Sequence, residues 1–238
     1  MTRYPRCLAA GDRALLVEFG DRIDDRLNQQ VLALAAALAE VDGLVKIIPT
    51  YRSVTLQYDP QLTDFDRLCQ QIARILATPA AEANLGRRWR VPVCYGGAWG
   101  EDLAALAEHH QLTPQQAIDL HSAADYRVYM IGFMPGFAYL GGLSPSLFTP
   151  RRASPRAMTP GSSINIGGQQ TAISSVPGPS GWHLIGRTPW VPFDPRRARP
   201  FLFRAGDRVR FEPISEQEFQ RLAPRYRDGL SPQPENEL

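Results

Sequence analysis

The segment that decides the fold runs from Tyr126 to Thr188 and opens with YRVYMIGFMPGFAYLGGL at residues 126–143. Side chains at 126–131 alternate in character, which is typical of a buried strand. After residue 131, prolines recur too closely for a helix to persist between them, at Pro135, Pro145, Pro150, Pro155 and Pro160. This segment therefore predicts short strands joined by loops.

The first 80 residues predict an α+β domain. Apolar residues recur every three or four positions in two stretches, and each stretch is preceded by residues suited to cap a helix. The expected elements are two strands within 7–19, a helix from Asp24 or Asp25 to Gly43, strands at 44–49 and 53–58 and a helix from Thr63 to Leu76. A further strand at 88–95, beyond residue 80, would complete the set. This order is typical of the ferredoxin-like βαββαβ arrangement.

A β-barrel is expected over residues 81–226, because the chain there is rich in glycine, proline and short alternating segments. The alanine-rich stretch 77–86 is the predicted linker before it. The expected elements are the strand at 88–95, helices at 103–110 and 113–120, the strand at 126–131 and late strands at 200–204 and 207–212. Residues 227–238 are polar and are expected to fray.

Composition limits the possible functions. The chain has 238 residues, with 26 basic and 24 acidic side chains, so its charge favours neither nucleic acid nor a membrane as a partner. Lys46 is the only lysine and no glycine-rich loop precedes it, which excludes a phosphate-binding P-loop. Cys7, Cys69 and Cys94 are widely spaced, as expected of reduced thiols in a cytoplasmic protein. The sequence also lacks HExxH and CxxC, so no familiar metal site is expected.

Arginine, glutamine and threonine side chains are the candidates for binding an anionic substrate. Arg151 and Arg152 lie in TPRRASPR, where prolines restrict the backbone and planar guanidinium groups suit carboxylate or phosphate. For Arg156, in the same loop, a surface salt bridge is an equal alternative. In GGQQT at 167–171, Gln170 and Thr171 offer hydrogen bonds, while the two glycines permit either a close ligand or a barrel corner.

The remaining candidates are a histidine and several aromatic residues. His121 is expected at a helix end before the central strand, where an imidazole suits proton transfer, although a structural histidine is the commoner case. GWHLIGRT at 181–188 contains two further binding candidates, Trp182 as an apolar wall and Arg187 as a cationic anchor. Aromatic residues expected to complete that wall, or only to pack, are Phe133, Phe137 and Tyr139.

These motifs resemble one family over nearly the whole chain. GFMPGFAYLGGL, TPRRASPR, GGQQT and GWHLIGRT, with VCYGG at 93–97, are similar to the family that contains the B subunit of 5-oxoprolinase, the sporulation kinase inhibitor KipI and the first subunit of allophanate hydrolase. The resemblance implies that the second half is a cyclophilin-like barrel. It also implies a carboxyltransferase-type module whose other half is the C subunit of the same enzyme.

The resemblance implies an enzyme subunit that, with the A and C subunits, opens the anionic lactam 5-oxoproline to glutamate with ATP. On this interpretation the chain is inactive alone and a partner completes the ATP site. A second interpretation is a KipI-like inhibitor whose partner is a sensor histidine kinase. A third, proline isomerisation, follows from the fold alone. All would be cytoplasmic.

Some positions depart from the pattern typical of the family. Where relatives have glycine, this sequence has Ser162, Asn165, Ala172 and Ser180, and Ser174 stands where they have tyrosine. Asparagine readily adopts a positive φ, whereas serine and alanine are strained there. The departures therefore bear on whether this member keeps the shared activity.

Overall fold

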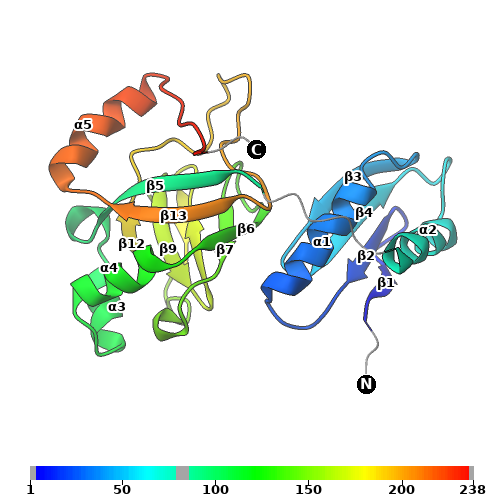
Figure 1. Ribbon diagram of the computed structural model, residues 1–238, viewed down its shortest axis with the longest axis horizontal. Helices are drawn as coiled ribbons and strands as arrows, with labels where there is room; N and C mark the ends of the chain where they lie inside the picture. The colour runs from blue at the N-terminus through cyan, green and yellow to red at the C-terminus, as the bar shows by residue number, and fades with distance from the viewer. Residues whose placement is uncertain (1–3, 79–85, 236–238) are drawn as a thin grey trace. The chain divides into compact units, whose positions relative to one another are not determined.

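A computed structural model describes residues 4–78 and 86–235 and divides the chain into two compact units, Met1–Asn84 and Leu85–Leu238 (Figure 1). Both units combine helices and strands, in agreement with the expected α+β class. Most of the predicted linker, residues 79–85, lies outside the described residues. Within the described parts, no helix has both the length and the apolar character needed to cross a bilayer.

The first unit is a four-stranded antiparallel sheet with two helices packed on one face. Its elements are β1 (Arg6–Ala9), β2 (Ala14–Glu18), α1 (Asp25–Ala37), β3 (Leu44–Pro49), β4 (Ser53–Tyr58) and α2 (Phe65–Ala77), and the strand order is β1-β2-β4-β3. Leu15 and Val17 of β2 alternate with more exposed residues, and they pack with Val31, Leu34 and the apolar stripe of α2. The period of two in the strands therefore buries one face of the sheet under the helices.

Aspartates cap both helices of this unit. Asp24 accepts hydrogen bonds from the amides of Arg26 and Leu27, which confirms one of the two predicted caps. The second helix is capped by Asp64, whose carboxylate accepts the amide of Arg67, so the prediction of Thr63 as the cap is wrong. Aspartate competes well for this position because its charge also suits the positive end of the helix.

The prediction for the strand at 88–95 is wrong in one respect: this strand, β5, belongs to the barrel instead of closing the N-terminal sheet. The first unit therefore has the element order ββαββα, and the ferredoxin-like arrangement is not confirmed. The physical reason lies in the inward residues of β5, since Trp89, Val91 and Val93 are buried in the core of the second unit.

The second unit is a closed barrel of seven strands, which fits the expected cyclophilin-like fold. Its strands, in barrel order, are β10 (Gln170–Ile173), β7 (Ala138–Gly141), β6 (Tyr126–Ile131), β13 (Arg208–Pro213), β5 (Arg88–Tyr95), β12 (His183–Arg187) and β9 (Ser163–Gly167). β13 and β5 run parallel, side by side in Figure 1, and the other pairs are antiparallel. A small sheet of β8 (Arg156–Thr159) and β11 (Gly178–Ser180) lies outside the barrel.

Helices α3 (Leu103–His109) and α4 (Pro114–Ala123) agree with the prediction. Thr113 and Gln116 form a capping box at the start of α4, with Pro114 in its first turn. One expectation near the C-terminus is wrong. Residues 200–204 form no strand, since Phe201 makes only an isolated bridge, to Phe193. Residues 216–227 form a helix where no element was expected.

This additional helix, α5 (Glu216–Arg227), begins at Ser215, whose hydroxyl accepts the amide of Glu218. The sequence SEQE is a capping-box signature that could have predicted it. Beyond α5, the expected frayed tail is anchored at one point. The amide of Glu235 donates to the carbonyl of Arg88, and the Glu235 carboxylate pairs with Arg90. The tail is held because β5 offers both a carbonyl and a cation.

Candidate functional site

Three aromatic side chains meet on the outward face of the barrel and form what we call the aromatic cluster: Phe137, Tyr139 and Trp182. The ring centroids of Phe137 and Tyr139 are 4.6 Å apart, and that of Tyr139 is 5.8 Å from Trp182. Ala172 of β10 packs with them, whereas its neighbour Ile173 points into the barrel core. The cluster therefore lies outside the core, over β7 and β10.

The two glycines of the GGQQT motif each have a structural reason. A Cβ atom on Gly167 would lie 2.5 Å from the indole of Trp182, so only glycine lets this ring lie against β9. Gly168 has a φ of +63° and opens the two-residue turn between β9 and β10. Gly167 thus positions the Trp182 wall, and Gly168 forms a barrel corner.

Two buried amide groups lie on the face that carries the aromatic cluster. Gln170 is on the Ala172 side of β10, is 4 % exposed, and its Nε2 has no hydrogen-bond partner among the described residues. Asn165 of β9 lies directly opposite Ala172, and its Oδ1 likewise has none. The donor and the acceptor without partners, beside one apolar wall, make this face the candidate site for a polar ligand.

Arg151 lies at the edge of this cluster. The central carbon of its guanidinium is 5.8 Å from the centroid of the Trp182 ring, within the range of a cation–π contact. Burial raises the pKa of the Tyr139 hydroxyl, and the positive charge of Arg151 opposes that rise. Arg151 is exposed and has no salt bridge to any described carboxylate. It is therefore a cation open to an anionic ligand.

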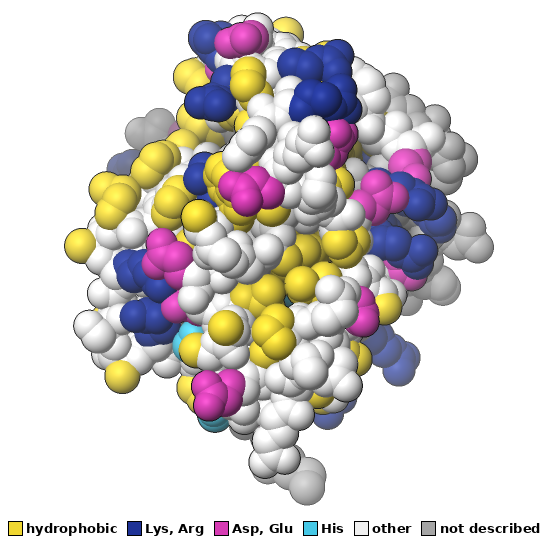
Figure 2. Space-filling model, turned by 90° about the vertical axis from the view of Figure 1, so that its left-hand side faces the viewer, with side chains coloured by type: hydrophobic (Ala, Val, Ile, Leu, Met, Phe, Trp, Pro, Cys, Tyr) yellow, Lys and Arg dark blue, Asp and Glu magenta, His cyan; other side chains and the backbone are white. Residues whose placement is uncertain are grey.

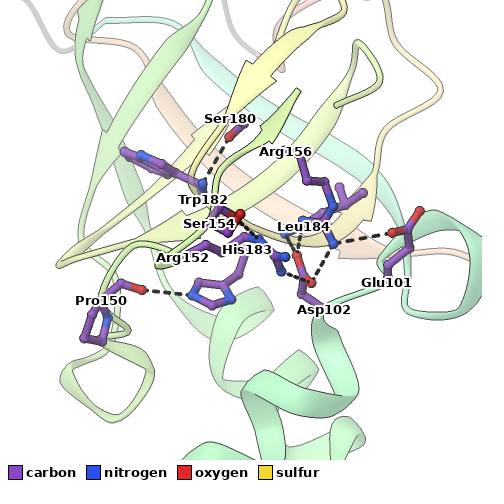
Figure 3. A network of polar contacts seen from close by, with 10 residues as sticks. All are labelled: Glu101, Asp102, Pro150, Arg152, Ser154, Arg156, Ser180, Trp182, His183 and Leu184. Carbon is purple, nitrogen blue, oxygen red and sulfur yellow. Dashed lines mark hydrogen bonds and ion pairs between the residues drawn. The ribbon is translucent and has the colours of Figure 1, made fainter. Parts of the chain in front are cut away.

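The other two arginines of TPRRASPR are held by one carboxylate, Asp102, which Figure 3 shows at the centre of a polar network. Arg156 binds both of its oxygens, at 2.6 and 2.7 Å, and Arg152 binds Oδ1 at 2.8 Å. The amide of Leu184 donates to Oδ2 at 2.7 Å. We call this arrangement the Asp102 clamp.

Burial tends to raise the pKa of Asp102, but the hydrogen bonds from Arg156 and the Leu184 amide, with the charges of both arginines, hold it below its usual value. The clamp ties the loop that follows Arg151 to β12. Arg152 also donates its amide to the carbonyl of Gly181, the residue before Trp182. The clamp thus positions both Arg151 and Trp182.

His121 lies inside the barrel, where both of its ring nitrogens are bonded. Nδ1 is 2.8 Å from the hydroxyl of Tyr95, and Nε2 is 3.0 Å from that of Thr171, which donates its proton to the carbonyl of Asn165. Nε2 must therefore carry a proton and Nδ1 must accept one from Tyr95. Burial lowers the pKa of His121 to about 3. The geometry gives His121 and Thr171 a structural part rather than contact with a ligand.

Arg187 lies apart from the aromatic cluster. Its guanidinium is 5.4 Å from the Trp99 ring centroid and 6.0 Å from that of Phe219 on α5, and Nη2 donates to the carbonyl of Gly161. Burial lowers its pKa. α5 lies on the side of the barrel unit seen in Figure 2, where apolar side chains gather in a hollow with charged groups around it.

The structure therefore separates the residues that the sequence offered as candidates for binding a substrate. Arg151, Gln170, Phe137, Tyr139 and Trp182 come together on the outward face. Three other candidates lie elsewhere, since Arg152 is bound by Asp102, Thr171 points inward and Arg187 lies by α5.

Two residues of the site were not among the candidates from the sequence. Asp102 was not considered, and Asn165 was considered only as a departure from the family pattern. Asp102 directly precedes a predicted helix, which was the available signal, but its side chain caps nothing and bonds across the fold instead. Phe133, expected in the aromatic wall, is 67 % exposed and touches only its edge, 5.8 Å from Phe137. Among the described residues, no group of three or more His, Cys, Asp or Glu is placed to hold a metal ion.

The model of the carboxyltransferase domain family, subdomains C and D, matches residues 5–203. This chain belongs to that family. It is 40% identical over 222 residues to the B subunit of 5-oxoprolinase from Bacillus subtilis, a match that covers 88% of this chain and 92% of the relative. Such relatives do not support the alternative of a kinase inhibitor.

Solved structures of the family share the fold. The protein TTHA0988 superimposes with a TM-score of 0.77 at 36% identity, over 85% of this chain, which spans 40% of that longer protein. The urea carboxylase of Kluyveromyces lactis gives a TM-score of 0.71 over 94% of this chain, and at 19% identity it shows the fold alone.

The departures from the family pattern have visible consequences. Ser162 adopts a φ of +61°, a region that is strained for serine, and its hydroxyl donates to the carbonyl of Trp190 at 2.7 Å. Asn165 and Ser174 are bonded to each other, since Nδ2 of Asn165 donates to the hydroxyl of Ser174 at 2.9 Å. Asn165 also donates to the carbonyl of Ser163, and these two bonds fix the orientation of its amide.

Proposed function

We propose that this protein is the B subunit of a 5-oxoprolinase, which acts with the A and C subunits to open 5-oxoproline to glutamate at the expense of ATP. The observation that carries the proposal is the 40% identity to the B subunit of a 5-oxoprolinase over nearly the full length of both chains. Membership of the carboxyltransferase family and the open polar groups of the aromatic cluster support it. We propose the cytoplasm as its location, since ATP is available there.

The aromatic cluster offers a matching group for each part of the substrate. 5-Oxoproline is a five-membered lactam with a carboxylate. Arg151 would bind the carboxylate through its planar fork, and the ring would pack on Trp182. The lactam carbonyl would accept from Nε2 of Gln170, and the lactam N–H would donate to Oδ1 of Asn165. A lactam would thus satisfy the two polar atoms that the fold leaves open.

Opening this lactam requires activation, because an amide carbonyl is a poor electrophile and nitrogen a poor leaving group. ATP would transfer its terminal phosphoryl group to the lactam oxygen, water would add to the activated carbon, and the C–N bond would break. With a second water, the products are glutamate, ADP and phosphate. The sequence has no P-loop, so the nucleotide is assigned to a site that a partner subunit completes. This chain would hold and orient the lactam.

The test is reconstitution from the three purified subunits. We expect ATP hydrolysis that depends on 5-oxoproline when all three are present and none when this protein is left out. If the complete mixture releases no phosphate in response to 5-oxoproline, the proposal is wrong.

In that reconstituted enzyme, we expect Arg151→Ala to lower kcat/KM for 5-oxoproline by roughly 10- to 100-fold, because a charge-assisted hydrogen bond contributes about 1.5 to 3 kcal/mol. Arg225→Ala is the matched control, since it removes an exposed arginine of α5. Steady-state kinetics measure both. Equal kcat/KM values for the two variants would remove Arg151 from the site.

A further inference from the structure

A second cationic site lies on the outer face of the parallel strand pair β5 and β13. Parallel register places Arg88 directly beside Arg208, and Arg90 directly beside Arg210. The intervening residues Trp89 and Val209 point into the core, so all four arginines are on the outside. They line a pocket of about 270 Å³ together with Asp125 and Glu235.

The pair Arg90 and Arg210 is neutralised by carboxylates, whereas the pair Arg88 and Arg208 is not, within the part of the chain that the structure describes. Arg210 is bound by Asp125 through Nε and Nη2, at 2.8 to 3.1 Å. Arg90 is paired with Glu212 at 3.1 Å and with Glu235. Neither Arg88 nor Arg208 has a salt bridge to a carboxylate in residues 4–78 or 86–235. Two like charges side by side on a sheet are destabilising unless an anion lies between them.

The ligand chemistry follows from this pair. Two adjacent guanidinium groups present parallel N–H donors, the geometry that binds the oxygens of a phosphate group. A phosphate monoester carries close to two negative charges at neutral pH, which matches the two cations that no carboxylate of the described residues neutralises. We infer that the pocket between Arg88 and Arg208 binds a phosphate group, either free phosphate or the terminal phosphate of a nucleotide.

The chain supplies its own competitor for this site. Glu235 reaches the pocket from the tail beyond α5, with its amide on the carbonyl of Arg88 and its carboxylate on Arg90. A carboxylate at this point repels a phosphate that approaches Arg88. Removal of that charge should therefore tighten phosphate binding, an effect opposite in sign to the loss of an arginine.

The experiment is titration calorimetry of the full chain with inorganic phosphate, with ATP and with glutamate, at low ionic strength. We expect saturable binding of phosphate or ATP that weakens at least roughly tenfold, about 1.4 kcal/mol, in Arg88→Ala/Arg208→Ala. It should tighten in Glu235→Gln and stay unchanged in Arg225→Ala. Tighter binding of ATP than of phosphate identifies the ligand as a nucleotide, and equal binding identifies it as the free ion.

The inference is overturned by the absence of saturable binding to either phosphate probe, by binding that the double arginine variant retains, or by glutamate binding as tightly as phosphate. Unchanged affinity in Glu235→Gln would contradict the competition. Because the arginines point to solvent, thermal unfolding of each variant can verify that it is folded. The assay needs no partner subunit and no turnover, so the proposed function can fail without affecting it.

Discussion

We expect Asp102→Ala to lower the free energy of unfolding by about 3 to 5 kcal/mol, because it leaves the guanidinium groups of Arg152 and Arg156 without their carboxylate. The Asp102 side chain is only 9% exposed, and the Leu184 amide would also lose its acceptor. Urea unfolding followed by circular dichroism measures the change. The same variant should lose 5-oxoprolinase activity in the reconstituted complex, because the clamp positions Arg151 and Trp182.

Glu101→Gln is the matched control for this result. Glu101 is the neighbouring acid, its side chain is 61% exposed, and its single contact with Arg156 is 3.4 Å long. We expect its replacement to change stability by no more than about 0.5 kcal/mol, as for other exposed ion pairs. Similar losses in the two variants would show that the Asp102 clamp is not a buried ion pair.

The second large effect concerns pH and His121. Burial lowers the pKa of His121 from 6.5 to about 3 in the folded protein. The unfolded chain therefore takes up a proton first as the pH falls, and the stability present above pH 6.5 is lost progressively toward pH 3. Between about pH 7.5 and 4.5 we expect this one histidine to remove about 2 to 3 kcal/mol.

Carboxylates also titrate in this range, so the informative quantity is the difference between the wild type and His121→Gln. Urea unfolding of both proteins at several pH values should give a steeper loss for the wild type. His183→Gln replaces a histidine that bonds a backbone carbonyl at the surface, and it should keep the wild-type slope. Parallel curves for the wild type and His121→Gln would contradict a buried neutral imidazole.

Local patterns predicted much of the fold. Period-two alternation located β6, and a Thr-Pro pair located the start of α4, because both features depend on neighbouring residues. The placement of β5 could not be predicted in this way. Its residues alternate as any strand would, and only the shape of the barrel core, which accepts Trp89 between Trp190 and Phe203, selects its sheet.

The candidate site was also predicted only in part, because local patterns do not show contacts across the fold. Residue types indicated Arg151, Gln170 and the aromatic residues that the structure brings together on one face. Sequence alone could not show that Arg152 would meet Asp102, fifty positions away, because an ion pair across the fold leaves no local pattern. Adjacent residues of a strand point to opposite faces, so Gln170 and Thr171 never share a site, although their motif presents them together.

That last pair supplies the most direct test of the central claim, that the outward face of β10 holds the lactam. The measurement is the dependence of ATP hydrolysis on 5-oxoproline concentration in the reconstituted enzyme, for Gln170→Leu and Thr171→Val. We predict that Gln170→Leu raises KM by about tenfold or more with an unchanged urea midpoint. Thr171→Val should lower the urea midpoint and leave KM unchanged. A raised KM in Thr171→Val with no change in Gln170→Leu would place the substrate elsewhere and contradict the account.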